Sequence, residues 1–273
     1  MLALNKEDIT KLFVWLDDNL PKVRSVSVGR PSSLKDSELL TLLIWNTLTV
    51  RQKLLTDIHK WAKMEYGKDF PSMPTYANFV KHIHRVLPKL IFALGSLLDN
   101  TAPFRIMDST MLPVCRLVRA DKHKVAKDKA KFGKNHQGWH YGFKLHLSID
   151  LEGKIAGLAF TPANESDSQQ MKKTLNRFAK VAVGDGGYTA SRMQRSVWEK
   201  YGTIVISPPH PTQKRKIMAA WQHKLLLKRP KIESVFDYLK EHLHLVSSFP
   251  RSVEGYLVHY VRILLGYQVM ACS

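Results

Sequence analysis

The sequence predicts an α/β protein in which a helical region of about one hundred residues precedes a mixed region of strands and helices. Apolar residues recur at helical spacing through the first hundred residues. From residue 103 onward, short apolar or alternating runs bounded by turn residues replace that spacing. The hydrophobic content of 44% over 273 residues is enough to bury one large core or two modest ones. We therefore expect an all-helical domain over residues 1–100 and a second domain over residues 101–273.

Four helices are expected in the first domain. The first spans residues 5–20, with Asn5 as its cap, and the second follows a cap at Ser33. The third covers residues 53–66, and the fourth runs over residues 75–87 and ends before a proline.

The fourth expected helix carries a set of polar side chains, Asn78, Lys81, His82 and Arg85. Several short helices ending in one with an exposed polar face resemble a helix-turn-helix DNA reader. Periodicity alone allows an ordinary helical packing domain equally well.

Five strands are expected in the second domain, in the order βββαβαβα, at residues 104–110, 141–150, 154–163, 180–188 and 202–209. Helices fit residues 168–179 and 190–201, and a long helical stretch follows the fifth strand. Residues 116–134 form a basic, turn-rich insertion between the first two strands.

The charge balance indicates a polyanionic partner. There are 42 Lys and Arg residues against 23 Asp and Glu residues, a formal charge of +19, of which +15 falls on residues 101–273. The basic residues are interleaved with aromatic residues and histidines instead of lining one amphipathic helix. This pattern favours a nucleic acid over a membrane surface.

Only two cysteines are present, Cys115 and Cys272, and they form no CxxC pair. Neither a disulfide framework nor a cysteine zinc site is expected. The apolar runs fall short of a membrane span, so we expect a soluble protein of the cytoplasm.

Three acidic residues stand where packing alone does not explain them. Asp108 and Asp185 each end a strand-like apolar run, and two glycines follow Asp185. Glu233 follows Pro230 at the start of a helix with an apolar stripe. In so basic a domain, three such acids could bind two divalent cations roughly 3.5–4 Å apart. Oxygen ligands suit Mg²⁺ or Mn²⁺ better than zinc or copper.

These residues also carry a family resemblance. Asp108, Asp185 in the run DGGY, and an R-x-x-x-E-x-x-x-x-x-x-K spacing formed by Arg229, Glu233 and Lys240 resemble the DDE transposases of bacterial insertion sequences. With the runs YGFKLHLSID, TPANESDS and GRPSSLKDSELL, the chain is most similar to insertion-sequence family 982, over nearly its whole length. Related signatures carry a tyrosine three positions before the arginine, where this chain has Leu226.

The resemblance implies an RNase H-like catalytic core, a mixed five-stranded sheet with flanking helices, behind the all-helical N-terminal domain. It places the first acid on strand one, the second after strand four and the third on a later helix. It also implies that Arg229 and Lys240 contact phosphates near the scissile bond, with a surface ion pair as the alternative for each. The activity implied is recognition of terminal inverted repeats, cleavage, and joining of 3′-hydroxyl ends to target DNA, by a homodimer or larger assembly.

Further DNA-binding candidates have structural alternatives. Lys144 and His146 alternate on the second strand and would share one face, where half-buried structural roles fit them equally. Tyr188 could stack on an unpaired base or belong to the core. Lys231 follows Pro230 and is a further phosphate-contact candidate. Asp167, with Asn164, is expected to cap the turn into the next helix.

Two other functions stay open at this point. A structure-selective nuclease or resolvase of the same fold would hydrolyse DNA without joining it. A non-catalytic DNA-binding protein derived from a transposase would have no need of the three acids. The R-E-K helix and the helical N-terminal domain favour transposition.

Overall fold

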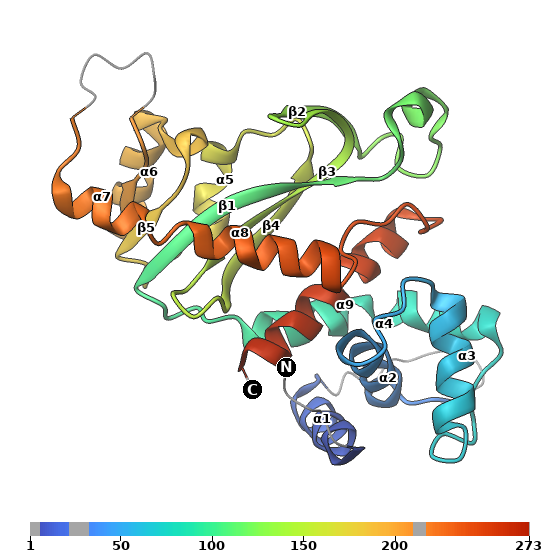
Figure 1. Ribbon diagram of the computed structural model, residues 1–273. Coiled ribbons are helices and arrows are strands. Elements are labelled where there is room, and N and C mark those ends of the chain that lie inside the picture. Colours follow the sequence, from blue (N-terminus) through green and yellow to red (C-terminus); the bar gives the residue numbers. More distant parts are fainter. Residues whose placement is uncertain (1–5, 22–32, 210–216, 273) are drawn as a thin grey trace. The chain divides into compact units, whose positions relative to one another are not determined.

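The computed structural model describes residues 6–21, 33–209 and 217–272 (Figure 1). The chain forms two compact units. Residues 1–97 together with 241–273 make up the helical unit, and residues 98–240 make up the mixed unit. The sequence placed residues 241–273 with the second domain, whereas in the structure they join the N-terminal helices. Asn5, expected to cap the first helix, lies outside the described residues.

The helical unit is built around the last helix of the chain. Its helices are α1 (Lys6–Asn19), α2 (Asp36–Leu48), α3 (Leu55–Tyr66), α4 (Tyr76–Leu97) and α9 (Val253–Cys272). α9 packs against α2 and α4, and Ile263, Leu264 and Leu265 are fully buried there. A helix that is apolar on nearly all sides must be covered on all sides, which explains why the N-terminal helices enclose it. None of the helices in the described part of the chain is both long and apolar enough to span a membrane.

The fourth helix does not end before Pro88, as the sequence predicted, but continues to Leu97. Pro88 is exposed, so its ring lies on the solvent side of the helix. Leu87, Leu90 and Leu94 are buried on either side of the proline, in a helix that packs on α9. Packing of this apolar face therefore outweighs the cost of one lost helical hydrogen bond.

His82 is not part of an exposed polar face. Its side chain is 4% exposed, and its Nε2 lies 2.6 Å from Oδ1 of Asp36 at the start of α2. Lys89 donates to Oδ2 of the same carboxylate at 2.6 Å, and Arg85 lies 3.6 Å away. The hydrogen bond with His82, assisted by Lys89, lowers the pKa of Asp36 well below its ordinary value despite partial burial. These residues tie α2 to α4. Asn78, Lys81 and Arg85 are the exposed members of the predicted set, and only Arg85 among them approaches Asp36.

The mixed unit contains one six-stranded sheet. Its strands are β1 (Phe104–Pro113), β2 (Lys131–Asn135), β3 (Gly138–Ile149), β4 (Ile155–Pro162), β5 (Val181–Val183) and β6 (Ile204–Ile206). β4, β3 and β1 pair antiparallel, and β5 and β6 continue the sheet parallel to β1. The order β4-β3-β1-β5-β6 is that of an RNase H-like core, so the predicted fold class is confirmed.

β2 is a strand that the sequence did not predict. It lies in the basic insertion and pairs with Gly138–Gly142, the first part of β3, while β4 pairs with the part of β3 that follows. Of its five residues, KFGKN, only Gly133 is buried. A strand at the sheet edge with this composition shows no apolar alternation, so pattern alone could not reveal it.

Helices flank the sheet, and two of them lie on opposite faces of β1. The helices are α5 (Asp167–Thr174), α6 (Ser191–Tyr201), α7 (Ala220–Leu226) and α8 (Pro230–Asp237), with 3₁₀ turns at Leu117–Lys122 (η1) and Gly186–Tyr188 (η2) and a π turn at Tyr238–His242 (η3). Met107 packs with Met171 of α5 and Val197 of α6. Side chains alternate along a strand, so Asp108 faces the other way. α8 crosses in front of β1 in Figure 1 and packs against it through a buried apolar stripe.

A fully buried arginine holds the start of β1. The Arg105 guanidinium makes five hydrogen bonds, to the backbone oxygens of Asn100, Ala102, Ala156 and Thr174 and to Oδ1 of Asn176, at 2.8–3.2 Å. It thereby connects β1 and β4 with the end of α5, the framework that carries the acidic residues described below.

We expect Arg105→Met to lower the free energy of unfolding by at least about 3 kcal/mol, because it leaves several buried carbonyl oxygens without a donor. Urea denaturation measures the loss. Arg192→Met on α6, where the arginine is exposed, is the matched control and should change stability little. Equal effects of the two substitutions would contradict this account of Arg105.

Candidate active site

The candidate site lies where β5 ends beside β1. β1 pairs with β5 only over Phe104–Ile106, while β1 itself continues to Pro113. Asp108 follows the last paired residue of β1 by two positions, and Asp185 follows the end of β5 by two positions. The parallel pairing therefore delivers both carboxylates to one end of the sheet. In open α/β sheets, sites commonly form at such carboxyl ends.

Asp108 is held in a largely buried position. Its side chain is 16% exposed, and its Oδ1 accepts a hydrogen bond of 2.7 Å from the amide of Ser109. Burial raises the pKa of Asp108 to about 6, and the charges of Asp185 and Asp167 add to that rise, while the Ser109 amide and Arg229 oppose it. The carboxyl group thus lacks enough positive charge around it to be fully ionised at mildly acidic pH.

Asp185 is fixed by the turn that follows it. Its Oδ1 accepts the amide of Gly187 at 2.8 Å, which caps the 3₁₀ turn η2. A Cβ atom at Gly187 would lie 3.0 Å from Oδ1 of Asp185 and 3.3 Å from Oδ2 of Asp167. A Cβ at Gly184 would lie 2.5 Å from the Tyr188 ring. Gly184 therefore allows the close approach of the Tyr188 ring, and a side chain at Gly187 would crowd the two carboxylates.

Tyr188 belongs to the core. It is 2% exposed and packs in the cluster formed with Met107, Met171 and Val197. A ring in this position is covered on both faces and cannot stack on a DNA base, so the structure favours the core alternative over the DNA-binding one.

α8 brings Glu233 and Arg229 to Asp108. Ile232, Val235 and Phe236 are buried, which leaves Glu233 half-exposed in the first turn of the helix. Nη2 of Arg229 lies 2.9 Å from Oε1 of Glu233 and 3.7 Å from Oδ2 of Asp108. One guanidinium thus connects two of the three predicted acids.

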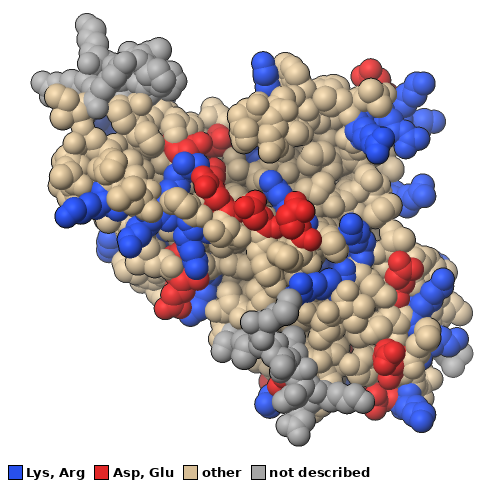
Figure 2. Space-filling view, in the orientation of Figure 1, with Lys and Arg blue, Asp and Glu red and all other residues tan. Residues whose placement is uncertain are grey.

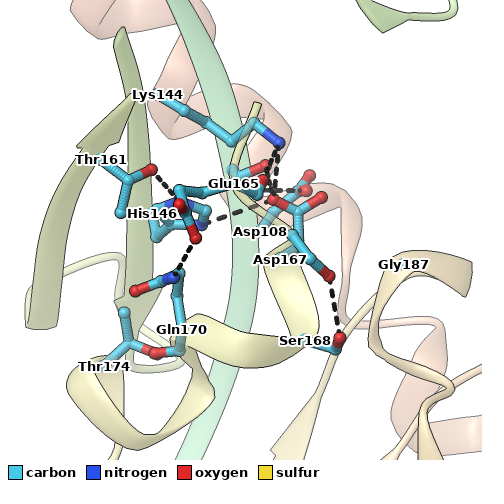
Figure 3. Close-up of polar contacts among 12 residues, drawn as sticks. Asp108, Lys144, His146, Thr161, Glu165, Asp167, Ser168, Gln170, Thr174 and Gly187 are labelled. Atoms are coloured by element: carbon cyan, nitrogen blue, oxygen red, sulfur yellow. Dashed lines mark hydrogen bonds and ion pairs between the residues drawn. The ribbon is translucent and has the colours of Figure 1, made fainter. Parts of the chain in front are cut away.

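A fourth acid, Asp167, joins the group. The residue opens α5, and neither it nor Ser166 caps that helix through a side-chain hydrogen bond, so the expected capping role is wrong. Oδ1 of Asp167 instead accepts Oγ of Ser109 at 2.7 Å and lies 3.2 Å from Nζ of Lys144 (Figure 3). Because Ser109 is the chain neighbour of Asp108, this hydrogen bond brings the Asp167 carboxylate next to the candidate site. The alternation of Lys144 and His146 on β3 was the one sequence signal that pointed here.

Lys144 and His146 support Asp167 from β3. They are 8% and 1% exposed, and Figure 3 shows both side chains pointing toward Asp167. Lys144 also donates to the backbone oxygen of Glu165 at 2.8 Å, and Nε2 of His146 lies 2.8 Å from Oγ1 of Thr161. Burial lowers the pKa of His146 to about 4, although Asp167 opposes the effect, so the ring is neutral at pH 7. The structure favours the structural alternative for this pair over contact with DNA.

Lys231 and Lys240 lie on α8 and on the π turn that follows it. Lys231 is exposed on α8, and Lys240 is half-buried in the π turn η3. Lys240 lies close enough to His140 to lower the pKa of that histidine, next to a larger effect of burial.

The chemistry of the donor set fits a divalent cation. Asp108, Asp167, Asp185 and Glu233 offer only oxygen ligands, against the positive charges of Arg229 and Lys144. The raised pKa of Asp108 shows that a further positive charge would be stabilised there. In the described ranges, no three His, Cys, Asp or Glu side chains are already arranged to hold a metal ion. Glu233 is paired with Arg229.

Comparison with known protein families identifies the family of this chain. The family model of the transposase DDE domain matches residues 99–253, more than half of the chain. The chain belongs to this family. Its sheet, its site and the strand ends that carry the acids all lie within the matched residues. This transposase is therefore an enzyme of the class that acts on DNA in transposition and DNA recombination.

Among solved structures, the transposase is similar to a chain in the crystal structure of a pre-cleavage Mos1 transpososome. The sequence identity is 14%, the match covers 98% of this chain and 88% of that chain, and the TM-score is 0.21. A TM-score this low carries no further structural argument.

The raised pKa of Asp108 predicts a pH-dependent stability in the metal-free protein. Its folded value of about 6 exceeds the ordinary 3.8, so its contribution to stability is present below pH 3.8 and is lost as the pH rises through 6. Asp108→Asn should therefore stabilise the protein by about 3 kcal/mol at pH 7.5 and have little effect near pH 3.8.

Urea denaturation between pH 3.8 and 7.5, with a chelator present, measures this difference. Glu152→Gln, which changes an exposed carboxylate of the mixed unit, is the matched control and should not alter the pH profile. A stability difference between wild type and Asp108→Asn that does not change with pH would contradict the assignment.

Proposed function

We propose that this protein is an insertion-sequence transposase that binds the terminal inverted repeats of its element, cleaves there, and joins the 3′-hydroxyl ends to target DNA. The observation that carries the proposal is that Asp108 lies close to Asp185 and shares Arg229 with Glu233, in a chain of the transposase DDE domain family. The strongly basic composition supports a DNA substrate.

Asp108, Asp185 and Glu233 are the residues proposed to hold two divalent cations, Mg²⁺ or Mn²⁺. When bound, such ions activate the attacking oxygen and stabilise the leaving oxygen in phosphoryl transfer. The chain's own residues set the geometry. The Ser109 amide orients Asp108, the Gly187 amide orients Asp185, and Asp167 holds the Ser109 side chain.

Arg229, Lys231 and Lys240 are the proposed phosphate contacts of the site. Arg229 pairs with Asp108 and Glu233 in the DNA-free protein, so a DNA phosphate would compete with two carboxylates for the same guanidinium. Figure 2 shows Lys and Arg side chains in several groups over the visible face instead of in one continuous patch.

Two element ends must be held together for joining, so a homodimer or larger assembly on DNA is part of the proposal. The helical unit, with Asn78 and Lys81 exposed on α4, is proposed to contribute to DNA binding. A bacterial cytoplasmic protein associated with the nucleoid follows from the same activity.

The first test is metal-dependent cleavage and joining of labelled DNA that carries the element's own ends. Glu233→Gln should lower both activities at least about 100-fold while DNA binding is retained, because a metal-binding carboxylate is replaced by a neutral amide of equal size. Asp237→Asn, which changes an exposed acid on the same helix, is the matched control and should keep activity.

Equal activity of Glu233→Gln and wild type would move the active site elsewhere. Cleavage without joining by the wild-type protein, with paired ends supplied, would instead favour a structure-selective nuclease. Binding without cleavage by the wild type would favour a non-catalytic DNA-binding protein.

The proposed double role of Arg229 gives a second test. Arg229→Ala should lower the slope of log affinity for DNA against log salt concentration by about 0.9, the value of one phosphate. In the DNA-free protein it should tighten Mn²⁺ binding, because a cation that competes for Asp108 and Glu233 is removed. Arg229→Lys keeps the charge and is the control. An unchanged salt slope would show that Arg229 contacts no phosphate.

A further inference from the structure

A second basic site lies entirely within the helical unit. It is a pocket of about 380 Å³ between the start of α3, the segment that precedes α9, and the first turns of α9. Lys53, Arg251 and Arg262 line it, and none of its lining residues is acidic. The pocket is separate from the acids of the mixed unit, and no role proposed above uses it.

Arg262 lines this pocket as a buried cation without an anionic partner. It is 2% exposed, and its guanidinium donates to Oγ1 of Thr47 at 2.9 Å and to the backbone oxygen of Gln52 at 3.0 Å. Its Nε has no acceptor, and no described carboxylate pairs with it. A buried charge without a counterion is costly, so an anion in the pocket would be stabilised by it.

His259, which lies beside Arg262 on α9, adds no charge. Burial lowers the pKa of His259 to about 3, and Arg262 adds to this effect, so the ring is neutral at pH 7. The positive charge of the pocket therefore comes from the lysine and the two arginines.

The start of α3 supplies hydrogen-bond donors to the same pocket. α3 has twelve residues, and Leu54 at its N-cap position offers no capping side chain. The amides of Leu55 and Thr56, two residues that line the pocket, have no acceptor in the described part of the chain. Uncapped amides at a helix N-terminus favour a negatively charged group. The neighbouring start of α9 differs, because Ser252 accepts the amide of Gly255 at 2.9 Å.

Exposed groups surround this donor set. Lys53 and Arg251 are exposed and take part in no described ion pair. Tyr76 and Phe249, 41% and 52% exposed, also line the pocket. Aromatic faces beside cations and free amides suit a phosphate that carries a sugar and base better than an isolated anion.

We propose that this pocket binds one backbone phosphate of DNA, held by Lys53, Arg251 and the first amides of α3, with Arg262 compensating its charge from the buried side. The inference rests on the proposed function for the identity of the partner. It gives the helical unit a phosphate contact built from two stretches far apart in the sequence, one at the start of α3 and one around the start of α9. A phosphate contact of this kind positions DNA without reading its sequence.

The test compares Lys53→Ala combined with Arg251→Ala against a matched control, Lys60→Ala combined with Lys63→Ala. Both pairs remove two exposed positive charges from the helical unit, but Lys60 and Lys63 lie on α3 outside the pocket. The pocket variant should lower the salt slope of DNA binding by about 0.9, and the control should lower it much less. Equal slopes for the two variants would overturn the proposal.

A second arm separates a DNA phosphate from a free anion. At constant ionic strength without DNA, inorganic phosphate should raise the Tm of the wild type and the control, and this rise should be lost in the pocket variant. If phosphate protection is lost while the salt slope for DNA is unchanged, the pocket takes a free anion and the assignment to DNA is overturned. Equal Tm values of the two variants without phosphate verify that both are folded.

The proposed function and this inference can fail separately. If the wild type joins DNA ends and the pocket variant keeps the full salt slope, only the inference fails. If the wild type neither binds nor cuts DNA, the proposed function fails whatever the pocket binds.

Discussion

Mutual repulsion among carboxylates at the end of β5 is the constraint on which the rest of the mixed unit depends. Asp108, Asp167 and Asp185 lie close enough for the latter two to raise the pKa of the first, and Glu233 joins them through a shared arginine. Such a group persists in a folded protein only if its surroundings oppose the repulsion. Arg229 and Lys144 supply positive charge, and the amides of Ser109 and Gly187 supply hydrogen bonds. The neutral state of His146 leaves Lys144 as the cation on Asp167, so the group keeps an excess of negative charge that a divalent cation can neutralise.

The fold provides that opposition through rigid elements. β1 lies between an antiparallel and a parallel neighbour, and the parallel neighbour ends early, which opens the edge of β1 at Asp108. Arg105 ties the start of the same strand to β4 and to the end of α5, while the buried stripe of α8 fixes the turn that carries Arg229 and Glu233. The acids thus occupy β1 beyond its pairing with β5, the turn after β5 and the first turns of two helices, where core packing fixes the backbone.

Much of this arrangement could be predicted from sequence, and the failures have identifiable physical causes. Asp108, Asp185 and Glu233 were recognisable because each interrupts an apolar pattern at the end or the start of an element. Pro88 and β2 were misjudged since local rules gave way to tertiary packing in one case and to edge pairing of a polar segment in the other. The roles of Asp167 and Tyr188 depend on contacts between residues far apart in the chain, Asp167 with Ser109 and Tyr188 with Met107. No periodicity in a single sequence reports such contacts.

Charge in this protein has two distinct physical settings, and they bear differently on DNA binding. Arg229 already pairs with two carboxylates. A phosphate that binds Arg229 must break those pairs, and the free energy of breaking them is subtracted from the free energy of binding. Arg262 and the first amides of α3 have no anionic partner, so a phosphate in the pocket of the helical unit breaks no ion pair there. The pocket should therefore contribute binding that is independent of the state of the acids, whereas the contribution of Arg229 should depend on whether those acids are otherwise neutralised.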